Sequence, residues 1–274
     1  MKTQSKETLL QKLLGQNYKW WFLASFTFKV RTNYLLDTLF AIVGGVIQFI
    51  GAILVWIITI RSGAPLSLSQ ILTYFIIGKI FAQFCNSIVQ HDLADDIKDG
   101  KLINKLLNTS DLFGQYFWRS FGGDIFYSFW NIIALSFIAL FFWQNIIWVS
   151  WVNFILAVLL IIFSRQVLFY YQILTGSLAF WSTEANRILR TTNYISIFCS
   201  GLLFPLDLIN ETKFLQFTPF ALFYYHPMQI YLGKYSPIET ILVFLGGIFW
   251  CIILYFLAKL VFKMGLKKNE SVGL

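Results

Sequence analysis

Long apolar runs dominate the sequence and leave few architectures open to the chain. Six of them are long enough to cross a membrane, whose hydrocarbon core needs about 20 helical residues. The runs are continuous rather than alternating in polarity, and inside lipid only helices and closed barrels satisfy the backbone hydrogen bonds. We therefore predict an all-α integral membrane protein with six transmembrane helices. The expected spans are Asn33–Ile60, Ser67–Gln90, Leu112–Phe142, Val149–Phe180, Ile188–Phe204 and Pro237–Phe262.

Composition agrees with this class. Hydrophobic residues make up 58% of the chain and charged residues 12%, about half the charged fraction of a soluble domain. The net charge of +8 would indicate nucleic acid in a soluble protein, but here the basic residues follow the expected topology. We expect contact with membrane lipid and none with nucleic acid. Cys85, Cys199 and Cys251 lie far apart in apolar runs, so they predict neither a disulfide framework nor a metal site.

The distribution of Lys and Arg predicts the orientation of the chain. Basic residues gather before the first run, between the second and third, between the fourth and fifth, and after the last. Because basic residues concentrate on the cytoplasmic side of a membrane, we expect a multi-pass protein of the plasma membrane with both termini in the cytoplasm. Tryptophans fall near both expected interfaces, as aromatic belts do.

Two further segments have patterns of their own. In residues 1–32, apolar residues recur at helical spacing opposite lysines, which predicts a cytoplasmic interfacial helix in the headgroup plane, with an ordinary amphipathic tail as the alternative. The residues are Leu10, Leu13, Leu14, Trp21 and Phe28, opposite Lys12 and Lys19. Residues 33–274 form the predicted transmembrane domain. Within it, residues 205–236 are too apolar for a solvated loop, so we predict short re-entrant helices in the outer leaflet before the last span.

One polar segment, residues 91–108, interrupts the apolar sequence. Five of the thirteen carboxylates gather in or beside it, at Asp92, Asp95, Asp96, Asp99 and Asp111. The HDLADD sequence has the His and Asp spacing of an acyltransferase dyad. Three of the aspartates, at positions 92, 95 and 99, also share one helix face, as in the first aspartate-rich motif of membrane prenyltransferases. A membrane-embedded prenyl- or acyl-transferase is therefore an alternative function, although the remaining acids are scattered and form no second cluster.

The same segment also has the pattern of a docking element. Gly100 breaks the helix, and leucines and an isoleucine after it form a second apolar edge. A short amphipathic helix projecting into the cytoplasm between two spans can hold a partner, and its mixed charges give register and specificity more than affinity. A solvated turn that keeps charges out of lipid is the plain alternative.

The order of elements and several loose motifs resemble the permease subunits of type 2 ATP-binding-cassette exporters over essentially the whole chain. The motifs are DIxxGxLxxLL (Asp96, Ile97, Gly100, Leu102 and Leu106), AFW at 179–181, GLLFP at 201–205, Pro219-Phe220 and HPMQIYLG at 226–233. Where the family pattern leads us to expect a second proline after Pro205, this chain has Ile209 and Asn210, so its outer loop departs from that pattern.

The resemblance implies that the segment at about 91–108 is a coupling helix, which sits in a groove of a separate cytoplasmic ATPase. The implied contact residues are Asp92, Asp95, Asp96, Ile97, Lys98, Asp99, Gly100 and Leu102. The chain has no GxxxxGK[ST] loop, so we expect no catalytic residue and no cofactor in it, with ATP and Mg in the partner ATPase. The resemblance also implies a second permease subunit, either an identical copy or a sibling, and transport by alternating access. A structural membrane protein without cargo is a weaker alternative.

Charged residues within spans are costly and face the bundle interior. Lys79 and Asp124 each lie about 12 residues into their spans, near the membrane midplane. We predict an ion pair between them that ties two helices together, in preference to a role in substrate or proton handling. Arg165 is expected nearer the cytoplasmic end, at the interface or beside Asp37. Gln48, Asn131, Gln166 and Tyr171 are further polar residues in spans, and the 30 phenylalanines are compatible with a hydrophobic or amphipathic cargo.

Overall fold

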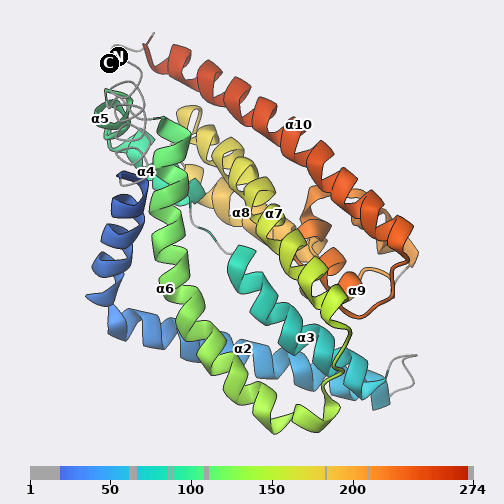
Figure 1. Ribbon diagram of the computed structural model, residues 1–274. Helices are drawn as coiled ribbons and strands as arrows, with labels where there is room; N and C mark the ends of the chain where they lie inside the picture. The colour runs from blue at the N-terminus through green and yellow to red at the C-terminus, as the bar shows by residue number, and fades with distance from the viewer. Residues whose placement is uncertain are drawn as a thin grey trace, which may run out of the picture.

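The computed structural model describes residues 19–61, 67–85, 87, 89–107, 111–182, 184–208 and 210–270, which contain helices and no strand (Figure 1). Residues 19–32, here called the N-terminal helix, precede the labelled elements. The α-helices are α2 (Leu35–Arg61), α3 (Leu68–Ala82), α4 (Val89–Lys98), α5 (Leu102–Leu106), α6 (Leu112–Phe141), α7 (Trp151–Gly176), α8 (Ala185–Cys199), α9 (Tyr225–Tyr231) and α10 (Pro237–Glu270). Short 3-10 helices are η1 (Gln83–Cys85), η2 (Trp143–Asn145), η3 (Ser177–Phe180), η4 (Asn210–Phe217) and η5 (Pro219–Phe223).

Within the described residues, five helical stretches are long and apolar enough to cross a membrane. They are Leu35–Ile60, Leu68–Lys98, Leu112–Phe141, Trp151–Phe180 and Pro237–Lys268, and they confirm an all-α membrane protein. The predicted fifth span, Ile188–Phe204, falls on α8, which has 15 residues and is short of the roughly 20 that a helix needs to cross the hydrocarbon core. Arg187 and Arg190 near its start also make α8 more polar than the five stretches named above. The count of six spans therefore stays a prediction.

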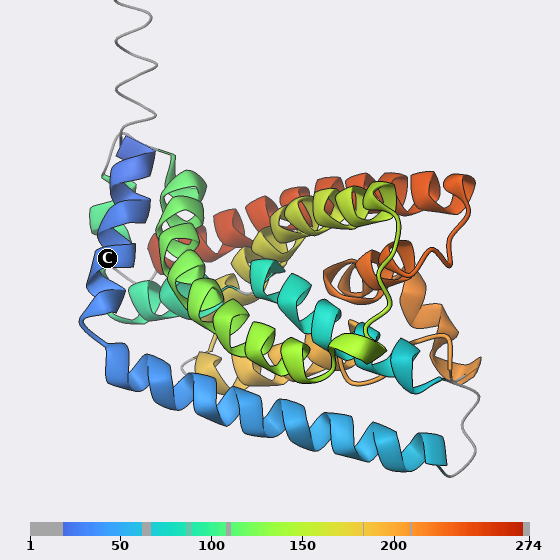
Figure 2. The same ribbon diagram turned by 60° about the horizontal axis from the view of Figure 1, so that its bottom comes forward.

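Helix α7 is the centre of the bundle. It packs against α10 along much of its length and also contacts α4, α9, η1 and η5 (Figures 1 and 2). Its buried face includes Ala157, Leu160, Ile161 and Val167, which join residues of α3 and α9 in the largest apolar core. Elements far apart in the sequence are thus held together by one apolar helix.

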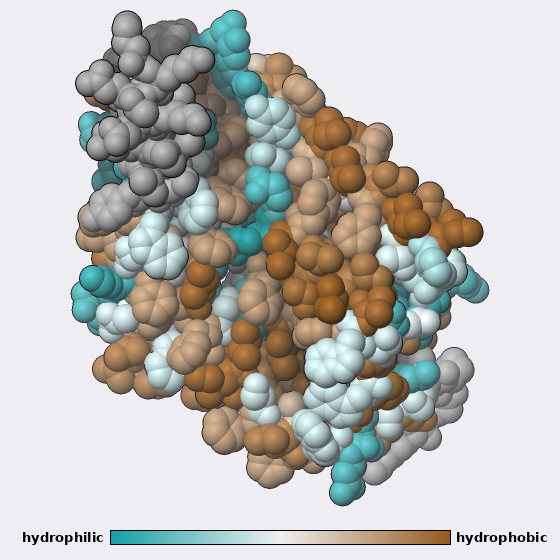
Figure 3. Space-filling model, viewed as in Figure 1, coloured by the Kyte–Doolittle hydropathy of each residue, from teal (hydrophilic) through white to brown (hydrophobic). Residues whose placement is uncertain are grey.

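The outer helices keep apolar side chains on the molecular surface. Figure 2 shows α2 lying along one side of the bundle, where it buries Phe49 and Ile53 but leaves Leu36 and Phe40 more than two-thirds exposed. Apolar residues also cover the visible surface of α10 (Figure 3). Exposed apolar faces of this size are unfavourable in water but suited to lipid or to another apolar helix.

Two tyrosines tie α3 to the segment that follows α8. The Tyr74 hydroxyl donates to the Gly201 carbonyl at 2.7 Å, and the Tyr224 hydroxyl donates to the Tyr74 carbonyl at 2.9 Å. Every residue of α9 is buried. The expected short helices are therefore present, in contact with the transmembrane bundle, and their place in the outer leaflet stays a prediction.

The N-terminal helix runs beside the first half of α6. Phe28 meets Phe126 edge to face at 5.3 Å between ring centroids, and Arg31 donates to the Tyr127 hydroxyl at 3.4 Å. About one helical turn before the Phe28–Phe126 contact on both helices, Gly122 faces the backbone of Ala24 so closely that a Cβ atom would collide with it. The absence of a side chain at Gly122 therefore permits the close approach of the helices. Residues 1–18 of the predicted interfacial helix lie outside the described residues, and its place in the headgroup plane stays a prediction.

We predict that Gly122→Val separates the N-terminal helix from α6. Because the obstructing atoms are backbone, the helices must move apart, and overpacking of this kind costs about 1–3 kcal/mol. Thermal unfolding in neutral detergent measures the loss. Gly44→Val on α2 is the matched control, since nothing lies within 4 Å of its Cβ position. Equal unfolding temperatures for the two variants would contradict the close contact.

Candidate functional site

Helices α4 and α5 form the polar segment that the sequence singles out. Helix α4 ends at Lys98, the chain turns at Gly100 with φ of 70°, and α5 begins at Leu102. The positive φ favours glycine, which lacks the Cβ that makes this region strained for other residues. Helix α4 packs against α7, η3, α8 and α6. Its apolar face, which includes Leu93 and Ile97, belongs to a second buried core.

The predicted coupling residues do not share one face. Asp95, Lys98 and Asp99 are exposed, Asp92 and Gly100 are half-buried, and Asp96, Ile97 and Leu102 are buried. The helical period explains this division, because positions 93, 96 and 97 lie on the side of α4 that meets the bundle. Only the exposed members are open to a partner, whereas the buried ones fix α4 and α5 to the rest of the chain.

Asp96 anchors the segment through a buried network. Its carboxylate accepts a hydrogen bond from the Tyr116 hydroxyl at 2.6 Å and forms an ion pair with Lys105. The Lys105 ammonium also lies 4.2 Å from the centroid of the Tyr116 ring. Burial lowers the pKa of Lys105, and its hydrogen bond with Asp96 opposes this shift. The network joins α4, α5 and α6, a link that the sequence spacing did not reveal.

An exposed surface with charged and apolar parts remains on the other side. We call Asp95, Lys98, Asp99, Ile103 and Leu107 the coupling surface. Leu107 is 78% exposed and Ile103 41%, and the sequence marked them only as an apolar edge. Exposed apolar side chains flanked by charges are typical of protein contact sites.

An acidic cavity of about 490 Å³ lies next to this surface. Asp92, Asp95, Asp96 and Asp99 line it, together with Lys101, Lys105 and Arg119. Within the described residues, no three His, Cys, Asp or Glu side chains are grouped so that they could hold a metal ion. The Asp96 carboxylate is already engaged by Lys105 and Tyr116, and Asp99 pairs with Lys101 at 2.6 Å. A metal-diphosphate site would need these carboxylates as metal ligands, but two of them already pair with lysines. The arrangement therefore does not favour the transferase alternative.

We predict that Asp96→Asn loosens α5 from the bundle. The substitution leaves the largely buried Lys105 ammonium without its carboxylate, a change that costs roughly 3 kcal/mol for a buried pair. Hydrogen exchange of the α5 amides should accelerate in proportion. Asp99→Asn is the control, since its exposed pair with Lys101 should contribute less than about 1 kcal/mol. Similar exchange rates in both variants would show that the Asp96 network does not hold α5.

Directly before α4, the helical stretch is interrupted. Helix α3 ends at Ala82, η1 follows at Gln83–Cys85, and α4 begins at Val89. We call the described residues of this interval, Gln83–Cys85 and Ser87, the helix break. Interrupting a helix leaves carbonyl groups without their regular partners, and this is tolerated at membrane depth only where protein or a cavity surrounds the backbone.

Three side chains from neighbouring helices satisfy carbonyls of the helix break. Ser128 of α6 donates to the Gln83 carbonyl at 2.8 Å. Two residues of α7 complete the set, with Arg165 donating to the Phe84 carbonyl at 3.3 Å and Gln172 to the Ser87 carbonyl at 2.7 Å. Polar residues of two different helices, α6 and α7, thus satisfy the same stretch of backbone, a shared role that sequence reasoning did not reveal.

The ion pair of Asp124 differs from the predicted one. Its carboxylate binds the Arg165 guanidinium at 2.7 Å, and both side chains are largely buried. Lys79 instead lines a cavity with residues of α7 and α8. The predicted Lys79–Asp124 pair is therefore wrong, and so is the expectation that Arg165 reaches the interface or Asp37. Counting residues along a span predicts the depth of a residue, but it does not determine which face of the helix carries that residue.

We predict that Arg165→Met destabilises the protein more than the double change Asp124→Asn with Arg165→Met. The single variant leaves a buried carboxylate unpaired and removes the donor to Phe84, which costs roughly 3–5 kcal/mol. The double variant restores charge balance, so part of the stability should return. Arg190→Met, at an exposed position of α8, is the control. Thermal unfolding in detergent gives the comparison, and equal losses for the single and double variants would refute the pairing.

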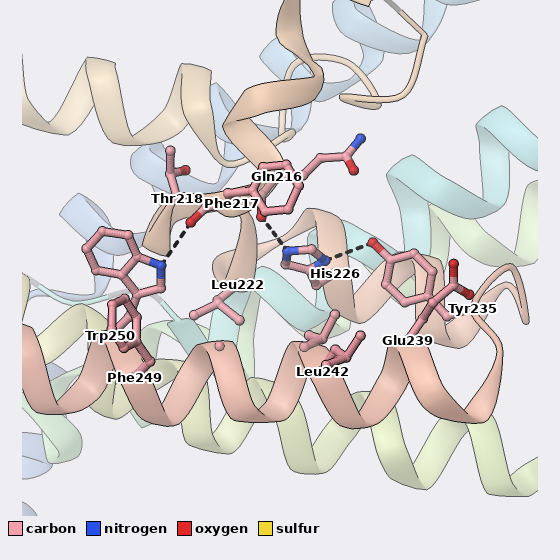
Figure 4. A pocket seen from close by; sticks show the side chains of 12 residues that line it. Gln216, Phe217, Thr218, Leu222, His226, Tyr235, Glu239, Leu242, Phe249 and Trp250 are labelled. Atoms are coloured by element: carbon pink, nitrogen blue, oxygen red, sulfur yellow. Dashed lines mark hydrogen bonds between the residues drawn. The ribbon is translucent and has the colours of Figure 1, made fainter.

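A separate cavity of about 520 Å³ lies between α10 and the short helices after α8 (Figure 4). His226 bridges its wall, with Nδ1 2.8 Å from the Tyr235 hydroxyl and Nε2 2.8 Å from the Gln216 carbonyl. A carbonyl only accepts, so Nε2 carries the proton and Nδ1 accepts from Tyr235. Burial lowers the pKa of His226 to about 4, which keeps the ring neutral near pH 7. Trp250 closes the other end by donating to the Phe217 carbonyl at 2.9 Å. The two hydrogen bonds of His226 therefore hold the segments of Gln216 and Tyr235 together, which is a structural role.

The fold and these sites define a polytopic helical membrane protein with an exposed polar segment between two of its long helices. A family model described as ABC-2 family transporter protein matches residues 46–273. The chain therefore belongs to the ABC-2 family of transporter membrane proteins, as its motifs led us to expect. No curated protein and no solved structure matches it.

Proposed function

We propose that this chain is the permease subunit of an ATP-driven exporter and that a cytoplasmic ATPase docks on its coupling surface. Membership of the ABC-2 family supports a permease role. The observation that carries the docking proposal is the division of α4 and α5 into a face buried in the bundle and an exposed face with charged and apolar residues. A docking element needs an exposed face and a buried face. The partner binds the exposed face, and the buried face transmits the movement of the partner to the bundle.

The route of that force follows from the contacts of α4. The helix is fixed to α7, η3 and α8 and is joined to α3 through the helix break. ATP and Mg²⁺ belong to the partner, and this chain contributes no catalytic residue to hydrolysis. Displacement of α4 by the ATPase would change the angle between α3 and α4 at the helix break and so alternate access to the transport path.

A second permease subunit completes the proposed transporter. The exposed apolar faces of α2 and α10 are available to a copy or a sibling of this chain as well as to lipid. The cluster of basic residues around α4 and α5 supports the orientation in which the coupling surface and both termini face the cytoplasm of the plasma membrane. In this arrangement the cargo is a hydrophobic or amphipathic molecule moving outward.

We predict that reversing the charges of Asp95 and Asp99 to Lys abolishes docking of the ATPase that co-purifies with the wild-type chain. Juxtaposed like charges disfavour a complex by several kcal/mol, so binding should weaken by about 100-fold or more. Stimulated ATP hydrolysis should fall in parallel, because the permease no longer engages the enzyme.

Glu184→Lys is the matched control, because it reverses an exposed acid that pairs with Arg187 outside the coupling surface. Wild-type docking by this variant, with docking lost in the Asp95→Lys, Asp99→Lys protein, supports the proposal. Undiminished docking of the doubly substituted protein would overturn it, and so would the failure of any ATPase to co-purify with the wild-type chain.

A further inference from the structure

A small polar cavity lies among the transmembrane helices, next to the helix break. Its volume is about 220 Å³, and it is bounded by α3, η1, α7, α8 and η5. The polar residues of its lining include Lys79, Gln83, Ser87, Gln172, Asn193, Ser196 and Ser200. The coupling surface and the acidic cavity beside it share no residue with this site. It is therefore a second polar site, in a region where polar groups are costly.

Lys79 brings a positive charge to this cavity without a counter-charge. No carboxylate lines the cavity, and within the described parts of the chain Lys79 takes part in no ion pair. The acid expected to neutralise it, Asp124, is engaged by Arg165. An unpaired ammonium within a span is unfavourable, so the site is complementary to an anion.

Gln172 supplies a second unmet interaction. Its side chain is only 4% exposed, and its Nε2 atom is occupied by the Ser87 carbonyl at 2.7 Å. Its Oε1 atom, in contrast, is buried and accepts no hydrogen bond from the described residues. Buried polar atoms are satisfied in the great majority of cases, so this oxygen indicates a missing donor. A ligand with an anionic oxygen and a hydroxyl or N–H group would satisfy both Lys79 and Gln172.

The size and rim of the cavity indicate what carries the anion. A volume of about 220 Å³ is below the roughly 300–1,000 Å³ of pockets that enclose a whole drug-sized ligand, so it accommodates a head group. Asn193 is exposed at the rim, and apolar residues such as Ile197, Leu202 and Phe223 complete the lining. The apolar chain of a bound amphipathic molecule can therefore leave the cavity past these apolar residues, along α8.

The adjoining helix break adds an independent reason to assign a ligand here. Gln83, Cys85 and Ser87 come from the break itself and line the cavity. Interrupted transmembrane helices occur where the backbone lines a cavity, and in transporters such places hold substrates and ions. Any change in the angle between α3 and α4 would also change the shape of this cavity.

We propose that this cavity binds the anionic head group, a phosphate or carboxylate, of an amphipathic cargo, with Lys79 as its ion-pair partner and Gln172 Oε1 as an acceptor. The inference rests on the proposed transport function and names the chemical class of its substrate. Lys79 thereby acts in recognition of cargo, whereas Arg165 has the structural role at the break.

Equilibrium binding tests the assignment with the full-length protein in nanodiscs of zwitterionic phosphatidylcholine. Labelled dodecyl phosphate is the probe, and dodecyltrimethylammonium and inorganic phosphate are competitors. We expect saturable binding that the cationic amphiphile does not displace. Lys79→Gln should weaken it by about tenfold or more, the effect of a lost charge-assisted hydrogen bond, while Lys79→Arg keeps the charge and should retain binding. Lys259→Gln on α10, whose lysine lines a different cavity, should bind as the wild type does.

A second variant keeps the test independent of any folding defect in Lys79→Gln. Asn193→Asp adds a carboxylate at the exposed rim, where it competes for Lys79 and should also weaken binding. Asn186→Asp, at an exposed position on the same helix away from the cavity, is its control. Unchanged binding in Lys79→Gln or in Asn193→Asp would overturn the assignment. Displacement by inorganic phosphate at equal concentration would show that a free anion is the ligand and refute the amphipathic cargo.

The two proposals fail in different ways. If the ATPase docks normally and Lys79→Gln binds the probe as the wild type does, this cavity is not the cargo site although the transport function stands. If Lys79→Gln loses the probe but no ATPase ever co-purifies, the cavity binds amphipathic anions and the transport function is refuted. The Asp95→Lys, Asp99→Lys variant should retain probe binding, because neither residue lines the cavity.

Discussion

Backbone carbonyls at the helix break need partners in a region without water, and the satisfaction of these groups organises much of the structure. Ser128, Arg165 and Gln172 each donate to one of them, and Asp124 holds Arg165 in place. Without the interruption, the polar groups of these four residues on α6 and α7 would lack these partners, which is unfavourable inside a membrane. With it, they allow a chain in lipid to bend where a continuous helix would be stiff.

The polar residues of the spans therefore divide into two groups with different physical tasks. One group is engaged within the protein, as in the Asp124–Arg165 ion pair and the hydrogen bonds to the break. The other, Lys79 with Gln172 Oε1, has charge and hydrogen-bonding capacity left over. Buried polar groups with unused charge or hydrogen-bonding capacity are favourable only where a ligand supplies the missing partner. This difference distinguishes the polar residues that stabilise the bundle from those of the proposed binding site.

Much of the fold was predictable because apolar runs of about 20 residues have few alternatives in lipid. The position of the polar segment between two long apolar stretches also followed from sequence order and charge, and its docking role is a proposal that rests on the family motifs. Which side chains face inward did not, because Asp96, Ile97 and Leu102 are buried by their helical phase against α7 and α6, not by composition. The Lys79–Asp124 pair failed for the same reason. Local hydropathy also did not predict the shortness of α8 or the break after Ala82.

Helix α6 contacts both α4 and the first residue of the helix break. Tyr116 holds Asp96 on α4, and Ser128, twelve residues or about 18 Å farther along, holds Gln83 just after α3. Sliding of α4 along α6 would disrupt one contact or the other, whereas a swing about α6 keeps both. The contacts of α6 are therefore compatible with a rotation of α4 relative to α3 about the α6 axis. The N-terminal helix, packed against α6 at Gly122, supports α6 in turn.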